Sequence, residues 1–165
     1  MTLRLAKILL VAAVAFFYTI VVLNNLTDYG SNYQFVHHVL LMDTTFPGNH
    51  LMWRSVHPTT VQIFSYDFII AWEALAMVLT WIGAIQLARA FRKPVVAFNA
   101  AKRLAILALT LGLLLWLVAF LCVGGEWFLM WQSKIWNGQE AAFRMFAVSG
   151  IIFLLLVQPD AEDQP

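Results

Sequence analysis

The sequence predicts an all-α protein, a bundle of four transmembrane helices that forms one integral membrane domain over residues 1–165. Hydrophobic residues make up 62% of the chain and charged residues only 12%, whereas soluble proteins carry about 25% charged residues. So little charge indicates that lipid, not water, covers most of the surface. Four long apolar segments and an uneven distribution of lysine and arginine complete the pattern.

The four apolar segments are the predicted spans, at about residues 8–23, 68–88, 104–123 and 141–157. Each approaches the roughly 20 helical residues that cross a hydrocarbon core. In lipid each must be a helix, because its backbone polar groups have to be satisfied within the segment. The first span follows Arg4 and Lys7 as a secretory signal would, but Asn24 and Asn25 replace the small residues of a cleavage site. We therefore interpret it as a retained anchor.

Basic residues predict the orientation of the bundle. Most of them precede the first span or lie between the second and third: Arg4, Lys7, Arg89, Arg92, Lys93, Lys102 and Arg103. By the positive-inside rule both termini are then cytoplasmic, and residues 24–67 and 124–140 form loops on the outer side. Asp160, Glu162 and Asp163 are expected to form a solvated cytoplasmic tail.

The long first loop is rich in aromatic residues, which argues against disorder. Residues 33–42 predict a short helix lying in the membrane interface, and Pro47-Gly48 predicts a type II turn. After the third span Gly124-Gly125 permits a bend, and the spacing of Trp127 and Trp131 predicts that they share a helix face. Four tryptophans lie on the predicted outer side: Trp53, Trp127, Trp131 and Trp136. They are interpreted either as an aromatic belt at the lipid headgroups or as an interface with a partner.

Ionisable residues near the outer ends of three spans form a candidate polar cluster. These residues are Glu73, Glu126, Arg144 and Glu140. Charged groups at membrane depth normally face the bundle interior and pair. We expect Arg144 to pair with Glu73, with Glu126 or with both. The simpler interpretation is a structural ion pair, and the alternative is an outward-facing polar pocket with one carboxylate left for a ligand.

The first loop holds a second candidate site, made of His37, His38, Asp43, His50 and Arg54. Histidine and aspartate are metal-ligand types. However, His37 and His38 are neighbours and would point about 100° apart on a helix, so they cannot both bind one ion without distortion. We therefore predict no metal site. No histidine lies in any span, which argues against a haem within the bundle, and no cofactor is predicted.

Several stretches resemble a bacterial family of predicted small integral membrane proteins that is known only as a domain of unknown function. They are residues 32–40, 42–49, 52–54, 72–73, 98–102, 124–133 and 136–139, and the likeness covers essentially the whole chain. The resemblance implies a multi-pass protein of a proteobacterial-type inner membrane, so that the outer loops would be periplasmic. It implies no activity and no catalytic residue.

The sequence gives weak support to an enzyme, because it contains no recognisable catalytic or phosphate-binding motif. A net charge of +1 does not suggest a nucleic-acid partner. We favour a non-catalytic accessory or binding subunit that uses its periplasmic face, in contact with the lipid bilayer and with a membrane-protein partner or a second copy of itself. The alternative is a transporter, or a protein that binds lipid, quinone or metal in a polar pocket facing the periplasm.

Overall fold

The protein is a helical bundle, seen in a computed structural model that describes residues 1–160. Its elements in chain order are α1 (Thr2–Thr27), α2 (Tyr29–Leu41), η1 (Met52–Arg54), α3 (Thr59–Ala90), α4 (Val95–Leu114), η2 (Leu115–Trp127), η3 (Met130–Gln132) and α5 (Gln139–Val157). Four helices, namely α1, α3, the continuous α4–η2 helix and α5, are long and apolar enough to cross a membrane. The prediction of an all-α protein with four spans is confirmed for the described residues.

The spanning helices extend beyond the predicted apolar segments. Helix α3 has 32 residues and begins at Thr59, well before Phe68, and α1 continues as far as Thr27. Pro58 and Pro94 directly precede α3 and α4. Proline suits a helix start because the first residues of a helix have no intrahelical use for their N–H groups. Hydropathy locates a span but does not mark where its helix ends.

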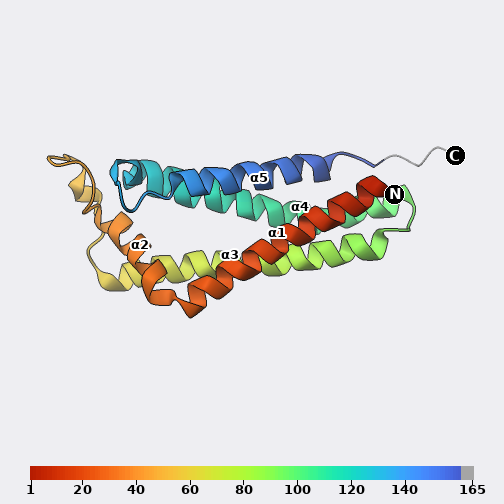
Figure 1. The fold of residues 1–165 in the computed structure, drawn as a ribbon, viewed down its shortest axis with the longest axis horizontal. Helices are drawn as coiled ribbons and strands as arrows, with labels where there is room; N and C mark the ends of the chain where they lie inside the picture. The colour runs from red at the N-terminus through yellow and green to blue at the C-terminus, as the bar shows by residue number, and fades with distance from the viewer. Residues whose placement is uncertain (161–165) are drawn as a thin grey trace.

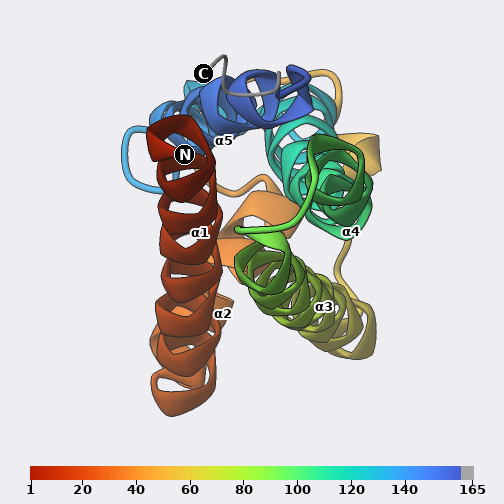
Figure 2. The same cartoon turned by 90° about the vertical axis from the view of Figure 1, so that its right-hand side faces the viewer.

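The bundle has two ends with different structures (Figure 1). At the terminal end lie the start of α1, the connection between α3 and α4, and the last turn of α5. At the loop end lie α2, the connection over residues 42–58, and the connection over residues 128–138. Seen along the length of the bundle, α1 lies to the left of α3 and α4 and leans across the bundle, so that its first turns lie beside α5 (Figure 2).

The second half of the α4–η2 helix is wound as a π-helix over 13 residues, Leu115–Trp127. In a π-helix each N–H bonds the carbonyl five residues earlier, a form that is rare and is found mostly as single turns at functional sites. The hydrogen bond from the Phe128 N–H to the Val123 carbonyl, 3.0 Å, closes the segment. Gly124 and Gly125 lie inside this helix, so the expected bend does not occur there.

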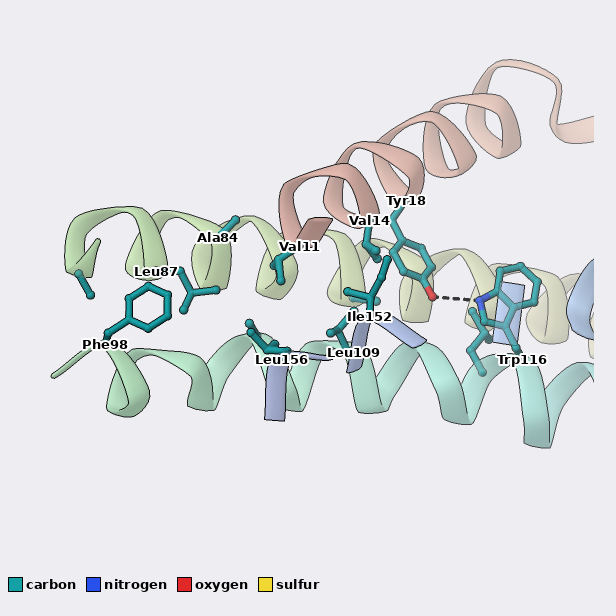
Figure 3. Close-up of a cluster of buried hydrophobic side chains, with 14 of the residues drawn as sticks. Val11, Val14, Tyr18, Ala84, Leu87, Phe98, Leu109, Trp116, Ile152 and Leu156 are labelled. Atoms are coloured by element: carbon teal, nitrogen blue, oxygen red, sulfur yellow. Dashed lines mark hydrogen bonds between the residues drawn. The ribbon is translucent and has the colours of Figure 1, made fainter. Parts of the chain in front are cut away.

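Buried side chains from all four spanning helices form the main core (Figure 3). Within it the indole N–H of Trp116 donates a hydrogen bond of 3.1 Å to the hydroxyl of Tyr18. Large apolar side chains elsewhere on the spans, such as Phe16, Ile151 and Leu154, are about 60% exposed or more. Such a surface is suited to contact with lipid chains rather than with water.

Helices α3 and α4 make their closest approach at Gly83. A methyl group added there would lie 2.8 Å from the Cα of Ala105, which is backbone and cannot move aside cheaply. Gly150 in α5 offers a matched control, because the nearest atom to an added methyl group is 3.8 Å away, on the Leu113 side chain. Small residues at such positions allow membrane helices to pack closely.

We expect Gly83→Ala to lower the free energy of unfolding by about 1–3 kcal/mol, the usual effect of overpacking. This corresponds to a melting temperature lower by about 2–12 °C for a chain of this size. Gly150→Ala should not lower it, because alanine is the better helix former. The measurement is helical circular dichroism on heating in mild detergent. Equal melting temperatures for the two variants would contradict the close packing at Gly83.

The loop end has its own smaller apolar core, which joins α2 to α3 and to residues 128–130. Helix α2 confirms the short helix predicted over 33–42, and Gly48 has the φ of +77° that the second central residue of a type II turn requires. Trp127 and Trp131 do not share a helix, because Leu129 between them has a φ of +55° and separates η2 from η3. The prediction of a shared face is therefore wrong.

Candidate functional site

Glu73 is the buried carboxylate of the spans, with 2% of its surface exposed. The Asn25 side chain, near the end of α1, donates a hydrogen bond of 2.7 Å to its Oε2. The Tyr66 hydroxyl donates in turn to the Asn25 side-chain oxygen, at 3.2 Å. Within residues 1–160 no basic nitrogen lies within 4 Å of Glu73. A neutral network that joins α1 to α3 therefore holds this carboxylate.

The expected ion pair of Arg144 is wrong for the part of the chain that the structure describes. Arg144 is exposed on α5 and forms no salt bridge there, and Glu126 and Glu140 are exposed as well. The four residues do not converge, because three of them are exposed and Glu73 is buried. Only Glu73 faces inward, and its partner is an asparagine that the sequence had suggested was part of a loop.

The histidines of the first loop have separate partners. His37 Nδ1 lies 2.7 Å from the side-chain oxygen of the buried Gln62, which also accepts from the Tyr33 hydroxyl. His38 Nδ1 lies 2.7 Å from Asp43 Oδ2. His50 is exposed. Among the described residues no three histidine, cysteine, aspartate or glutamate side chains are grouped closely enough to hold a metal ion. The candidate loop site is thus a set of local contacts.

The tryptophans of the loop end join the two long connections to each other. Trp53 packs edge-on against Trp127, and Trp131 packs edge-on against Phe46, with ring centroids 5.9 and 5.7 Å apart. Trp136 stacks on the ring of His38 at 4.7 Å. Trp53, Trp127 and Trp131 remain 44–70% exposed. These contacts hold residues 42–58 against residues 127–138 and leave an aromatic surface at this end.

Arg54 lies beside the two indoles of this surface and contacts both. Its Cζ is 4.4 Å from the centroid of the Trp127 ring and 5.4 Å from that of Trp53, within the range of cation–π attraction. Its Nη1 donates a hydrogen bond of 3.3 Å to the Trp127 carbonyl. Its Nε is buried without a hydrogen-bond partner in the described chain. The guanidinium is therefore fixed in place with most of its donors unused.

A cavity of about 400 Å³ lies at the loop end, between α2, α3 and η2. Its lining is almost wholly apolar and includes Phe35, Val39, Phe64, Phe68, Trp72 and Phe120. Phe64, Phe68 and Trp72 follow one another at four-residue spacing along α3 and pack ring against ring. This spacing is the one signal in the sequence that could have indicated the cavity. Because Phe64 and Phe68 are 70% and 53% exposed, the cavity lies next to the lipid-facing surface.

A polar cluster at the terminal end also escaped sequence reasoning. Lys7 Nζ lies 2.9 Å from Asp160 Oδ2, and Lys102 Nζ pairs with the same oxygen. Both lysines also donate to the Gln158 carbonyl just past α5, at 2.9 and 2.7 Å. The side chain of Asn99 accepts from the Asp160 N–H and donates to its carbonyl. The last described residues are thus bound to α1 and α4.

Asp160 is therefore not part of a solvated tail, because only 8% of its surface is exposed. Glu162 and Asp163, the other acidic residues expected in that tail, lie outside the described residues. Burial alone would raise the pKa of Asp160, but the hydrogen bonds and charges of Lys102 and Lys7 outweigh it and hold the pKa below its usual value. At neutral pH this carboxylate is ionised and compensates two buried lysines.

Comparison with known proteins agrees with the membrane-spanning architecture. No curated protein and no solved structure matches the chain. The model of a family described as "Predicted small integral membrane protein (DUF2165)" matches residues 3–159. The match covers the four candidate spans apart from Thr2 and ends one residue before Asp160. The chain belongs to this family of small integral membrane proteins.

Proposed function

We propose that this protein is a non-catalytic binding protein of the membrane that holds a lipid chain in the cavity between α2, α3 and η2. The observation that carries the proposal is the cavity itself, about 400 Å³ of apolar space next to the lipid-facing surface. Sites for small molecules are typically concave and apolar and lie within a range of about 300–1,000 Å³. In a bilayer the surrounding medium supplies hydrocarbon chains that fit such a lining.

The position of the cavity supports a lipid of one leaflet. Its lining residues come from α2, from the first part of α3 and from η2, all of which belong to the loop end. The basic residues Arg89, Arg92, Lys93 and Arg103 flank the α3–α4 connection at the terminal end. By the positive-inside rule we infer that the terminal end faces the cytoplasm and that the cavity lies in the outer, periplasmic half of the inner membrane.

The test is to fill the cavity. Ser65 lines it, whereas Ile63, two residues earlier on α3, is 40% exposed and does not. We expect native mass spectrometry of the wild type from mild detergent to show one retained phospholipid. Ser65→Trp should reduce the occupied fraction about tenfold, a loss of about 1.4 kcal/mol in binding. Ile63→Trp places the same indole outside the cavity and should retain the lipid.

Equal lipid retention by the two tryptophan variants would contradict the proposal, provided that both melt like the wild type. A wild type that carries no lipid but a stoichiometric protein partner would instead support an accessory subunit. The same mass spectrum distinguishes a lipid-binding protein from an accessory subunit, because a bound lipid and a bound protein partner add different masses to the chain.

A further inference from the structure

Arg54 is the cation of the loop end that the fold holds in one position. Lys134 and Arg144, the other basic residues at this end, are exposed and form no salt bridge in the described chain. Arg54 instead lies against the neighbouring indole rings of Trp53 and Trp127. The one hydrogen bond that its guanidinium makes within residues 1–160, to the Trp127 carbonyl, is long at 3.3 Å. An arginine has five N–H donors, so most of them have no protein acceptor.

The charge of Arg54 is also uncompensated. No carboxylate within residues 1–160 lies within 4 Å of its guanidinium, and the neighbouring Glu126 turns outward. A partly buried guanidinium held this way has already lost most of its conformational freedom in the folded protein. An anion that binds it therefore gains charge-assisted hydrogen bonds with little further loss of side-chain entropy. Its planar donors match the oxygens of a phosphate group.

The cavity lining includes residues that are close to Arg54 and Trp127 in the chain. Val56, two residues after Arg54, and Phe128, next to Trp127, both line the cavity. The Val56 N–H bonds the Leu40 carbonyl at 2.9 Å, which ties this part of the connection to α2. The two segments that carry Arg54 and Trp127 therefore also contribute residues to the cavity wall. The exposed indoles of Trp53 and Trp127 are of the kind that lies at the headgroup level of a bilayer.

We propose that the ligand of the cavity is an anionic phospholipid, with its acyl chain in the cavity and its phosphate on Arg54. This inference rests on the proposed function and adds to it the class of headgroup. Arg54, Trp53 and Trp127 form the polar mouth, and α2, α3 and η2 form the apolar wall. A zwitterionic lipid would bring a cationic group to the same mouth, where Arg54 repels it, so the site discriminates by headgroup charge.

The experiment compares two lipids with identical chains, phosphatidylglycerol and phosphatidylcholine, mixed in equal amounts in vesicles that contain the full chain. After extraction in mild detergent, native mass spectrometry gives the ratio of the two bound lipids. We expect the wild type to favour phosphatidylglycerol about tenfold, the effect of one hydrogen-bonded charge pair. Arg54→Gln should bring the ratio close to one while total lipid occupancy persists. Lys134→Gln, the matched loss of an exposed charge, should keep the preference.

The outcomes separate the two proposals. Lipid bound by the wild type without a headgroup preference, or a preference that Arg54→Gln leaves intact, would overturn the role of Arg54 and leave the cavity proposal standing. No bound lipid at all would overturn both. The phosphatidylcholine retained by Arg54→Gln reports that its cavity is intact, so a misfolded variant is recognised. Inorganic phosphate added during extraction should not lower the ratio, and a collapse of the ratio would indicate a free-anion site instead.

Discussion

Asp160→Ala should lower the free energy of unfolding by about 3–5 kcal/mol, the usual effect of removing one partner of a buried ion pair. The reason is that Lys7 and Lys102 are 1% and 3% exposed and share the Asp160 carboxylate. Without it two positive charges face each other at the terminal end. The melting temperature should drop by about 6–20 °C for a chain of this size, as measured by circular dichroism in mild detergent.

Two variants control this result. Glu126→Ala removes an exposed carboxylate that forms no salt bridge in the described chain, and its effect should stay within about 0.5 kcal/mol. Asp160→Asn keeps a hydrogen-bond acceptor but loses the charge, and should fall between the two alanine variants. If Asp160→Ala melted together with Glu126→Ala, Asp160 would not compensate the lysines.

The same network gives the wild type an acid-sensitive part of its stability. The pKa of Asp160 is lower in the folded state than its usual value of about 3.9. A lowered pKa means that the unfolded state binds the proton more readily than the folded state. The stability that the ionised Asp160 contributes is therefore complete above about pH 3.9, and it is lost as the pH falls through the pKa of the folded state. In Asp160→Ala this loss at low pH should be absent, and the two melting curves should converge there.

Glu73→Gln should leave the melting temperature unchanged or raise it, whereas Glu73→Ala should lower it. The glutamine carbonyl can still accept the hydrogen bond that Asn25 now donates to Glu73 at 2.7 Å, and a neutral amide is cheaper to bury than a carboxylate. Alanine leaves the Asn25 amide without its acceptor, which costs about 1–3 kcal/mol before any cavity is counted. Thermal unfolding in mild detergent gives both values.

Asn25→Ala provides the reciprocal measurement, because it removes the hydrogen-bond donor of Glu73, whereas Glu73→Ala removes the acceptor of Asn25. A Glu73→Gln variant that melted as low as Glu73→Ala would show that the charge, not the hydrogen bond, maintains the contact of α1 with α3. The glutamine variant also tests the transport alternative. The measurement is ion-dependent flux in vesicles. If the wild type supports such a flux and a stable Glu73→Gln variant loses it, the result would favour a transporter over a lipid-binding protein.

The sequence predicted the parts of the fold that depend on local composition. Hydropathy located the four spans, and the density of apolar residues after Tyr33 indicated α2. The sequence could not predict side-chain contacts that depend on how each helix is rotated about its axis. Both Glu73 and Arg144 were expected in one polar cluster, yet Glu73 turns inward to Asn25 and Arg144 is exposed. The π-helical winding of η2 changes that rotation further and has no residue signature that we recognise.

The candidate site was predicted only in its outline. The aromatic residues and Arg54 of the loop end were identified, but the cavity behind them was not, because three separate elements enclose it. Asp160 was misinterpreted for the same reason. An acidic residue after a proline near the end of the sequence resembles a solvated tail unless Lys7 and Lys102 are known to meet there. Convergence of residues far apart in the chain requires the fold.

The cluster at the terminal end has a consequence for the biogenesis of the protein. Lys7 and Lys102 emerge from the ribosome before Asp160, which follows all four spans in chain order. Until Asp160 is made, neither amine has the carboxylate that compensates it in the finished bundle. The ion pairs that join α1 and α4 to the residues after α5 can therefore form only after the last span has been synthesised.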